Sequence, residues 1–315
     1  MKKSRKIVCL GGGIGTVNLI KDLKEYDCSI SVVVSMADDG GSAGRLRRFY
    51  SVPPPGDLVS CTAAMSNADP LMQKLLTYRF TGNRYGSDHS LPGHKLGNLI
   101  LVALTSITGN FNTALLEMQR IFKAKGSILP STIENISIWA ETSSGDKVYG
   151  EENIDLGRFK GCIERLYLKP SNPKMPEEVK EVIEKANVIV AGPGDLYTTT
   201  LPVLMVPDIA DLIVKSEAQK FFVVNIANKP FETKDYKVSN YVKAIEKHLK
   251  AFPFQVIIAN NNLSQVIPNK YDYEYVENDI ESSSKIKVIA DDLVDINFPI
   301  YHDSNKLAKI VYKAI

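Results

Sequence analysis

Two aspartates, three glycines and three arginines lie within twelve residues, in the segment ADDGGSAGRLRR at positions 37–48. The segment directly follows the β-branched run ISVVVSM at 30–36, which is typical of a buried parallel strand. In Rossmann-like sheets an acidic residue at such a strand end holds ribose hydroxyls, so Asp38 and Asp39 are candidates for this role. The same two adjacent carboxylates could instead ligate Mg²⁺ beside a phosphate.

The basic residues of this segment suggest a phosphate contact. The glycines allow a tight turn, after which Arg45 could fork onto a phosphate with two parallel hydrogen bonds. The alternative is a salt-bridged turn in which Arg45 pairs with Asp38 or Asp39, but such a pair needs neither the glycines nor the strand end. We therefore expect Arg45→Ala to abolish ligand binding and to leave the fold intact. Arg47 and Arg48 are interpreted as solvated charges on a short helix.

A glycine cluster, GGGIGT at 11–16, follows the short apolar strand predicted at 6–10. The backbone amides of Gly12 and Gly13, with the dipole of the next helix, could hold an anionic oxygen. The cluster breaks the dinucleotide fingerprint, because Thr16 and Asn18 stand where glycine or alanine is required, and it is not a Walker A loop. A plain strand-to-helix turn is the alternative, yet three consecutive glycines exceed what a turn needs, so we expect phosphate or ribose binding.

A second glycine-containing loop, GPGDLYTTT, occupies 192–200 after another apolar run. Gly192 and Gly194 free the backbone, while Asp195, Tyr197 and hydroxyls such as that of Thr198 offer polar contacts. The threonines could equally cap the next helix, but capping uses one hydroxyl and three are present. Ligand contact is therefore the favoured interpretation.

Five further residues are weaker candidates. Asn225, Asn228 and Lys229 follow a later strand and could be ordinary loop residues. Asp57 follows three prolines and is expected to cap the helix after it. His94 opens a helix, and without a visible nucleophile beside it a structural role is favoured over acid–base catalysis.

The elements that must position these residues alternate between strand and helix. Strands are predicted at 6–10, 30–36, 187–191, 220–228 and 254–262, and helices at 16–25, 57–80, 94–108, 111–122, 172–186, 241–252 and 305–315. The helix at 94–108 is apolar nearly all round and is expected to be buried. Between 127 and 170 short strand-like runs alternate with turns. The sequence therefore predicts an α/β, Rossmann-like doubly wound, mostly parallel sheet formed by 1–126 and 171–315, with a β-rich insertion at 127–170.

This topology predicts that four candidate stretches meet. Ligands of open parallel sheets bind beyond the carboxyl ends of the strands, where the strand order reverses. The stretches at 11–16, 38–45, 192–200 and 225–229 all follow predicted strands. We expect the glycine turns to form one cradle of amide donors for a diphosphate, with aspartates beside it for sugar hydroxyls.

Composition narrows the class of protein. With 44% hydrophobic and 23% charged residues the 315-residue chain is typical of a globular protein, and a net charge of +2 gives no case for nucleic-acid binding. No run approaches the ~18 apolar residues of a membrane span, and no secretory signal is visible. The four cysteines form no CxxC pair and the four histidines lack zinc-ligand spacing, so we expect buried free thiols, no metal ligand set and a cytoplasmic protein.

With these residues described, the chain resembles the gluconeogenesis factor family, the YvcK-like proteins, which are related to 2-phospho-L-lactate transferase, CofD. The matching segments run in the family's order: IVCLGGGIGT, MADDGGSAGRLR, PPGDL, GHKLGNLIL, ILPSTIENI and VIVAGPGDLYTTTLPVLMVPDIADLI. The resemblance implies a Rossmann-like fold and a regulatory protein that binds UDP-glucose or UDP-N-acetylglucosamine. It also implies a cytoplasmic role in cell shape and wall synthesis on gluconeogenic carbon sources.

The resemblance also implies the binding residues. These are Gly12, Gly13, Thr16, Asp38, Asp39, Ser42, Arg45, Asp57, His94, Asn98, Gly192, Gly194, Asp195, Tyr197 and Thr198, to which the strand-end argument adds Asn225. The chain departs from the family where Lys229 and Phe231 replace Gln and Gly, and where Tyr301 replaces an Arg before His302. A CofD-like transferase of a phospho-lactyl group and an NAD-dependent oxidoreductase are the alternatives, and homo-oligomerisation stays open.

Overall fold

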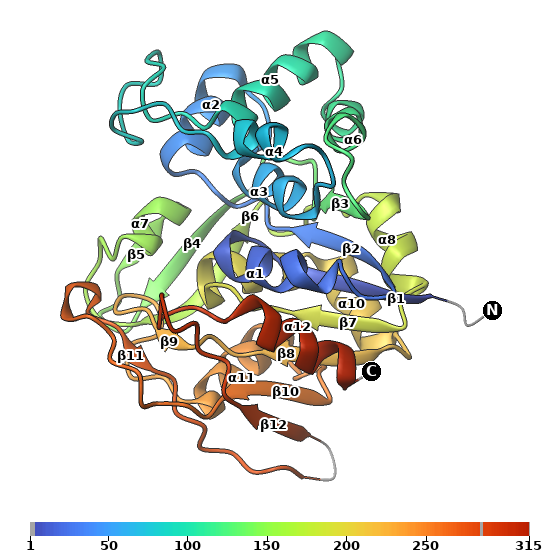
Figure 1. Ribbon diagram of the computed structural model, residues 1–315. Coiled ribbons are helices and arrows are strands. Elements are labelled where there is room, and N and C mark those ends of the chain that lie inside the picture. Colours follow the sequence, from blue (N-terminus) through green and yellow to red (C-terminus); the bar gives the residue numbers. More distant parts are fainter. Residues whose placement is uncertain (1–3, 284–285, 315) are drawn as a thin grey trace.

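A seven-stranded parallel sheet forms the centre of the computed structural model, which describes residues 4–283 and 286–314 (Figure 1). Its strand order is β12-β10-β8-β7-β1-β2-β3, and every neighbouring pair is parallel. The strands are β1 (Arg5–Gly11), β2 (Cys28–Val34), β3 (Ser127–Pro130), β7 (Val188–Ala191), β8 (Gln219–Val223), β10 (Val256–Asn260) and β12 (Lys287–Asp291). The predicted Rossmann-like, doubly wound α/β class is confirmed.

The strand order reverses between β1 and β7. From β1 the chain proceeds outward through β2 and β3, and it returns to the other side of β1 with β7 before continuing to β8, β10 and β12. The carboxyl ends of β1 and β7 therefore lie side by side at the topological switch point. This is the position at which open parallel sheets bind ligands.

Helices cover both faces of the sheet and form a group at the top of Figure 1. They are α1 (Gly13–Leu23), α2 (Gly41–Tyr50), α3 (Gly56–Met65), α4 (Pro70–Thr77), α5 (Leu96–Thr108), α6 (Phe111–Ile121), α7 (Glu151–Asp155), α8 (Glu177–Glu184), α9 (Leu201–Leu204), α10 (Pro207–Lys215), α11 (Val238–Leu249) and α12 (Ser304–Lys313). A π-helical turn (Leu196–Thr200) precedes α9, and a 3₁₀ turn spans Asn269–Tyr271. In Figure 1, α1 and α12 lie in front of the sheet and α2 to α6 above it.

The single helix predicted at 57–80 is wrong. The chain forms α3 and α4 instead, separated by 66–69. Asp69 caps α4 by accepting a hydrogen bond from the amide of Leu71 at 2.9 Å, and Pro70 is the first helical residue. An aspartate followed by proline is a start signal that overrides a continuous apolar pattern.

The expectation that the helix near 94–108 is buried all round is also wrong. Only one face of α5 is buried, and it consists of Gly97, Asn98, Leu101 and Val102. Ile107 is 79% exposed on the opposite face. The helix packs on α4 and α6 at the periphery, so composition overestimated its burial.

The predicted β-rich insertion contains a three-stranded antiparallel sheet, ordered β5-β4-β6. Its strands are β4 (Ser137–Thr142), β5 (Lys147–Tyr149) and β6 (Ile163–Lys169). The first strand of the predicted range 127–170 does not belong to it, because β3 pairs with β2 in the main sheet. The predicted strand at 220–228 is likewise divided: β8 ends at Val223, and β9 (Ala227–Asn228) pairs with β11 (Glu274–Tyr275).

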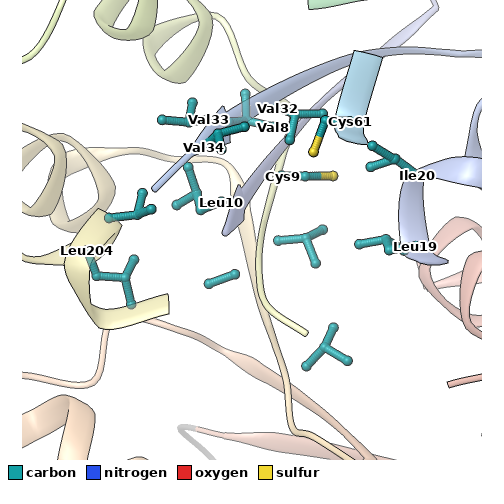
Figure 2. Packing of buried hydrophobic residues seen from close by; sticks show 14 of the residues in the cluster. Val8, Cys9, Leu10, Leu19, Ile20, Val32, Val33, Val34, Cys61 and Leu204 are labelled. Atoms are coloured by element: carbon teal, nitrogen blue, oxygen red, sulfur yellow. The ribbon is translucent and has the colours of Figure 1, made fainter. Parts of the chain in front are cut away.

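Apolar side chains from β1, β2, α1 and α3 form the core beside the switch point (Figure 2). Cys9 and Cys61 are buried there as free thiols, and burial raises the pKa of Cys9 to about 12. Cys28 is half-buried and Cys162 is exposed, so the expectation of buried thiols holds for two of the four cysteines. In the described part of the chain no single helix is long and apolar enough to cross a membrane; one pair bent by 72°, Leu196–Leu204 with Pro207–Lys215, meets the length and composition criteria.

Candidate functional site

A cavity of about 350 Å³ lies at the switch point, within the size range of small-molecule sites. It is lined by residues that follow four parallel strands: Gly13 after β1, Asp38 after β2, Gly194 after β7 and Asn225 after β8. The four stretches expected to converge therefore do so in space. The insertion also reaches the cavity through Asp155 at the end of α7, and so does β9 through Ala227.

Seven of the sixteen predicted site residues line this cavity, namely Gly13, Asp38, Asp57, Gly194, Asp195, Thr198 and Asn225. The other nine do not, and these are Gly12, Thr16, Asp39, Ser42, Arg45, His94, Asn98, Gly192 and Tyr197. Most of those nine lie one layer behind the cavity wall and hold the lining residues in place, as their hydrogen bonds show below.

The two glycine turns are in direct contact. The hydroxyl of Thr16 accepts a hydrogen bond from the amide of Gly12 at 2.9 Å and donates one to the carbonyl of Pro193 at 3.3 Å. Gly15 passes so close to the second turn that a Cβ atom there would lie 2.5 Å from the Pro193 carbonyl oxygen. Thr16, which breaks the dinucleotide fingerprint, is thus the residue that joins the two turns.

Asp57 acts across the cavity instead of capping its own helix. It lies in the first turn of α3, and its Oδ2 accepts a hydrogen bond at 2.8 Å from the amide of Gly13 at the start of α1. Its side chain does not accept a capping bond within α3, whose N-cap is Pro55. The predicted capping role is therefore corrected: Asp57 holds the amide of Gly13, and burial raises the pKa of Asp57. Since the amide of Gly12 donates to Thr16, neither of the two amides expected to hold an anionic oxygen is free, and that expectation is corrected as well.

Asp38 and Asp39 point to different places. Asp38 lines the cavity, where its Oδ1 accepts a hydrogen bond from the amide of Gly40 at 3.0 Å. Loss of water and the nearby Asp57 raise its pKa to about 7. Asp39 instead accepts from the amide of Glu152 at 2.9 Å and anchors α7 to the core. The alternative of a magnesium site formed by both residues is therefore not supported, because of these two carboxylates only that of Asp38 lines the cavity.

The arrangement of Arg45 differs from both sequence-based interpretations. The side chain is 1% exposed, and its two terminal nitrogens donate to the carbonyl oxygens of Pro92 (3.0 Å), Ser87 (2.5 Å) and Ser90. It neither lines the cavity nor pairs with Asp38 or Asp39. Replacement by alanine would remove the donor to the carbonyls of Pro92 and Ser90, so the expectation of an undisturbed fold is corrected.

Of the neighbouring arginines, Arg48 is exposed as expected, whereas Arg47 is partly buried. Arg47 donates from Nε to Oδ1 of Asn135 at 2.9 Å, and it also donates to the carbonyl of Ile136. Burial lowers the pKa of Arg47. Arg48 forms an ion pair with Asp88 at 2.9 Å. Neither residue lines the cavity, as the sequence predicted.

Ser42, His94 and Asn98 form a buried cluster that joins α2 to α5. The Oγ atom of Ser42 lies 3.0 Å from Nδ1 of His94 and accepts from the side chain of Asn98 at 3.2 Å and the amide of Lys95 at 3.3 Å. Because the hydroxyl accepts twice, its own proton is directed at His94, whose pKa is lowered by burial. A serine–histidine pair does exist, but neither residue lines the cavity.

The second glycine loop is held by residues that follow β8. The amide of Gly194 donates to Oδ1 of Asn225 at 3.2 Å. Thr198 donates to Oε1 of Glu232 at 2.5 Å, and the amide of Tyr197 donates to Oε2 at 3.3 Å. Glu232, which no sequence argument identified, thereby fixes both residues.

Lys229 lies within an acidic cluster at the cavity wall. Its Nζ is 2.9 Å from Oδ2 of Asp195 and also contacts Asp155. One carboxylate oxygen from each of Asp155, Asp195 and Glu232 lies within 4.8 Å of the others, which is close enough for a metal ion. The ammonium supplies positive charge there; burial alone would lower the pKa of Lys229, but these three carboxylates raise it.

Glu232→Gln is expected to flatten the pH dependence of stability. Burial and the nearby Asp195 raise the pKa of Glu232 to about 7 from the ordinary 4.5. The folded protein therefore retains a proton that the unfolded chain releases between about pH 4.5 and 7, so the free energy of unfolding falls as pH rises through this window, by up to about 3 kcal/mol. Urea unfolding at pH 5 and pH 8 measures the effect.

The control for this prediction is Glu178→Gln, at an exposed position of α8. The difference in unfolding free energy between wild type and Glu232→Gln should change between the two pH values, while that for Glu178→Gln should not. An equal offset of Glu232→Gln at both pH values would contradict the assignment.

The C-terminal departures from the family also reach the cavity. Tyr301 and His302 both line it, and His302 is buried with Nε2 lacking a partner among the described residues. Burial lowers the pKa of His302 to about 3, so the imidazole is neutral. Since His302 is neutral, the cations among the described lining residues are Arg84 and Lys229. The cavity is also lined by six carboxylates: Asp38, Asp57, Glu151, Glu152, Asp155 and Asp195.

Sequence reasoning missed the lining residues supplied by loops and by the insertion. Arg84 and Tyr85 come from the segment between α4 and α5, and Glu151 and Asp155 come from α7. The four-residue spacing of Glu151 and Asp155 places them on one helix face, which was the one usable signal. Nothing in the sequence indicated that this face meets the switch point.

Comparison with known proteins identifies the family. Residues 7–294 match the family model described as 2-phospho-L-lactate transferase CofD. The chain is 37% identical to the gluconeogenesis factor of Bacillus subtilis, covering 99% of this chain and 98% of that one, and 36% identical to the gluconeogenesis factor of Halalkalibacterium halodurans, covering 96% and 92%. A crystal structure of a member of the UPF0052 family from Bacillus halodurans superposes with a TM-score of 0.89 at 33% identity, covering 99% of this chain and all of that one.

These likenesses extend over essentially the whole chain, and they agree with the motifs at the switch point and with the parallel sheet. The chain therefore belongs to the CofD family (UPF0052), in which its similar relatives are named gluconeogenesis factors.

Proposed function

We propose that the protein is a regulatory protein that binds a UDP-sugar, UDP-glucose or UDP-N-acetylglucosamine, in the switch-point cavity. The contact between the two glycine turns carries the proposal, since it places the backbone at Gly13 and at Gly194 in one cavity. The amides of Gly13 and Gly194 already donate to Asp57 and Asn225, so the amides offered to a phosphate are those of Ile14 and Gly15, which also line the cavity in the first turn of α1. The surrounding carboxylates can accept hydrogen bonds from ribose and sugar hydroxyls.

The acidic lining of the cavity limits how a diphosphate can bind there. Six lining carboxylates would repel a diphosphate if all were ionised, so either a cation must accompany it or some of them must be protonated. The raised pKa values of Asp38 and Glu151 favour protonation near neutral pH. Carboxylate oxygens are also Mg²⁺ ligands, so Asp38, without Asp39, is the candidate contact for a Mg²⁺ ion that arrives with the diphosphate.

The regulatory part of the proposal rests on the relatives. Those that match over nearly the full chain are named gluconeogenesis factors. The resemblance stated above adds a cytoplasmic role in cell shape and wall synthesis during growth on gluconeogenic carbon sources.

Gly13→Val is expected to abolish UDP-sugar binding. A side chain at Gly13 would point into open space, with Thr199 Oγ1 as its nearest neighbour at 4.0 Å, and would fill the cavity where the diphosphate is placed. We expect affinity to fall at least about tenfold, which corresponds to about 1.4 kcal/mol. Isothermal titration calorimetry with UDP-glucose and UDP-N-acetylglucosamine measures it.

Gly109→Val is the matched control. Gly109 has a φ of +67° against +62° for Gly13, and a side chain there would meet no atom within 4 Å. Both variants therefore carry the same backbone strain, of about 1–2 kcal/mol, but Gly109 ends α5 away from the cavity. Normal binding by Gly13→Val would remove the glycine turn from the site. Wild-type protein that binds GDP or NAD in preference to UDP-sugars would reject the proposed ligand.

A second candidate function is favoured by the match to the CofD model: transfer of a phospho-lactyl group. Such a reaction would require a cation beside the phosphates and a platform for a flat acceptor ring. The one tryptophan, Trp139, does not line the cavity, since it stacks on Tyr167 with ring centroids 4.1 Å apart. Magnesium-dependent formation of a phosphodiester product on prolonged incubation would favour the transferase over the regulatory protein.

A further inference from the structure

The segment 78–95, between α4 and α5, brings two lining residues to the cavity from outside the sheet. Its ends are paired, because the amide of Phe80 donates to the carbonyl of His94 at 3.0 Å and the amide of Gly93 donates to that of Phe80 at 2.9 Å. Residues 81–92 between them contain neither helix nor strand. This closed loop contributes Arg84 and Tyr85 to the cavity wall.

Arg84 is the one lining cation that lacks a carboxylate partner within the described ranges 4–283 and 286–314. The other, Lys229, is held by Asp155 and Asp195, and its side chain is 14% exposed. Arg84 forms no ion pair with any described residue. A guanidinium without a carboxylate remains available for an anionic ligand, which it can bind with two parallel hydrogen bonds.

The guanidinium of Arg84 lies at the start of α2, beside Asp38. A Cβ atom at Gly41 would be 2.8 Å from Nε and 2.9 Å from one terminal nitrogen of Arg84, so the glycine leaves room for this side chain. The guanidinium also lies over the ring of Tyr85, with 4.9 Å to the centroid. These contacts hold the guanidinium without neutralising its charge.

The guanidinium of Arg45 holds this loop by hydrogen bonds to several of its residues. Besides the carbonyls of Ser87, Ser90 and Pro92, one terminal nitrogen lies 3.5 Å from the carbonyl of Arg84 itself, and the other donates to the hydroxyl of Ser90 at 2.9 Å. All five acceptors come from residues 84–92. A loop that lacks regular backbone pairing is therefore organised round a single buried guanidinium.

We propose that Arg84 contacts the diphosphate of the nucleotide ligand and that Arg45 is a positioning residue, which holds the loop so that Arg84 faces the cavity. The inference rests on the proposed UDP-sugar binding and adds to it the source of positive charge. Where the family resemblance implies an arginine, this chain has Tyr301, which carries no positive charge. The inference assigns the cationic contact to Arg84, which lines the same cavity.

The test compares Arg84→Ala with wild type by calorimetry, with UDP-glucose, UDP-N-acetylglucosamine and uridine as probes. Loss of a charge-assisted hydrogen bond should weaken both UDP-sugars about 10- to 100-fold. Uridine has no phosphate, so its affinity, measured by competition, should change less than about twofold. Arg120→Ala is the control of equal charge change, because Arg120 pairs only with Glu117 on the exposed face of α6.

The outcomes are distinct from those of the proposed function. If wild type binds no UDP-sugar, the proposed function fails. If wild type binds and Arg84→Ala binds equally well, or loses uridine and UDP-sugars to the same extent, the inference about Arg84 is overturned while the proposed function stands.

The positioning role of Arg45 is tested by a double-mutant cycle with Arg45→Met and Arg84→Ala. If Arg45 acts through Arg84, the double variant should bind UDP-glucose no more weakly than Arg84→Ala alone. Hydrogen exchange of the amides in 81–92 should also increase in Arg45→Met and stay unchanged in Arg84→Ala. Additive losses of affinity would overturn the positioning role, and Arg84→Ala still tests the phosphate contact if Arg45→Met does not fold.

Discussion

Gly15→Ala is expected to lower the free energy of unfolding by about 3 kcal/mol and to abolish nucleotide binding. The added methyl group would lie 2.5 Å from the carbonyl oxygen of Pro193 and 2.7 Å from its carbonyl carbon. These are backbone atoms of the second glycine turn, so no side chain can rotate away. The turns must separate, and the hydrogen bond from Thr16 to Pro193 must break with them. Urea unfolding and calorimetry with UDP-glucose measure the two effects.

Gly145→Ala is the control for this variant. Gly145 lies in a turn of the insertion with a φ of +84° and no atom within 4 Å of an added Cβ. The substitution there should cost about 1 kcal/mol of backbone strain and leave ligand binding unchanged. Stability of Gly15→Ala equal to that of wild type would mean that the two turns are not in the described contact.

Lys229→Met should be destabilising by about 3 kcal/mol at pH 8, because it leaves three buried or half-buried carboxylates without their shared cation. Destabilisation should be smaller at pH 5, where Glu232, with its pKa raised to about 7, is protonated.

The position that the Lys229 ammonium vacates in this variant lies among three carboxylates with ligand atoms within 4.8 Å of one another. We therefore expect Mn²⁺ or Ca²⁺ to raise the melting temperature of the variant and not that of wild type.

Two further variants delimit this prediction. Lys180→Met removes an exposed ion pair with Glu177 on α8 and should change stability by less than about 1 kcal/mol. The double variant Lys229→Met/Asp195→Asn should recover part of the lost stability and bind the added ion more weakly. A melting temperature of Lys229→Met that ignores both pH and divalent ions would show that the ammonium does not neutralise this cluster.

β1, β2 and β7 could be predicted because each is a short apolar run with glycine or aspartate close after it. By contrast, β12 was not predicted, and β3 was assigned to the insertion. β1, β2 and β7 lie within about two residues of their expected positions, and the switch point follows from their alternation with helices. The helices were predicted less accurately. At α3 and α4 a local Asp-Pro signal overrode the apolar pattern, and at α5 the peripheral position left an apolar face exposed.

The sequence by itself determined where the candidate site lies, since residues after four parallel strands must meet at one edge of the sheet. Only the tertiary structure decided what each side chain does there. Asp38 and Asp39 are adjacent in the chain, yet one faces the cavity and the other holds α7. Arg45 and Arg84 are 39 residues apart, yet Arg45 donates to the backbone of the loop that carries Arg84. Strand ends are specified by local backbone and burial patterns, whereas the partner of a charged group depends on segments that are distant in sequence and meet only after folding.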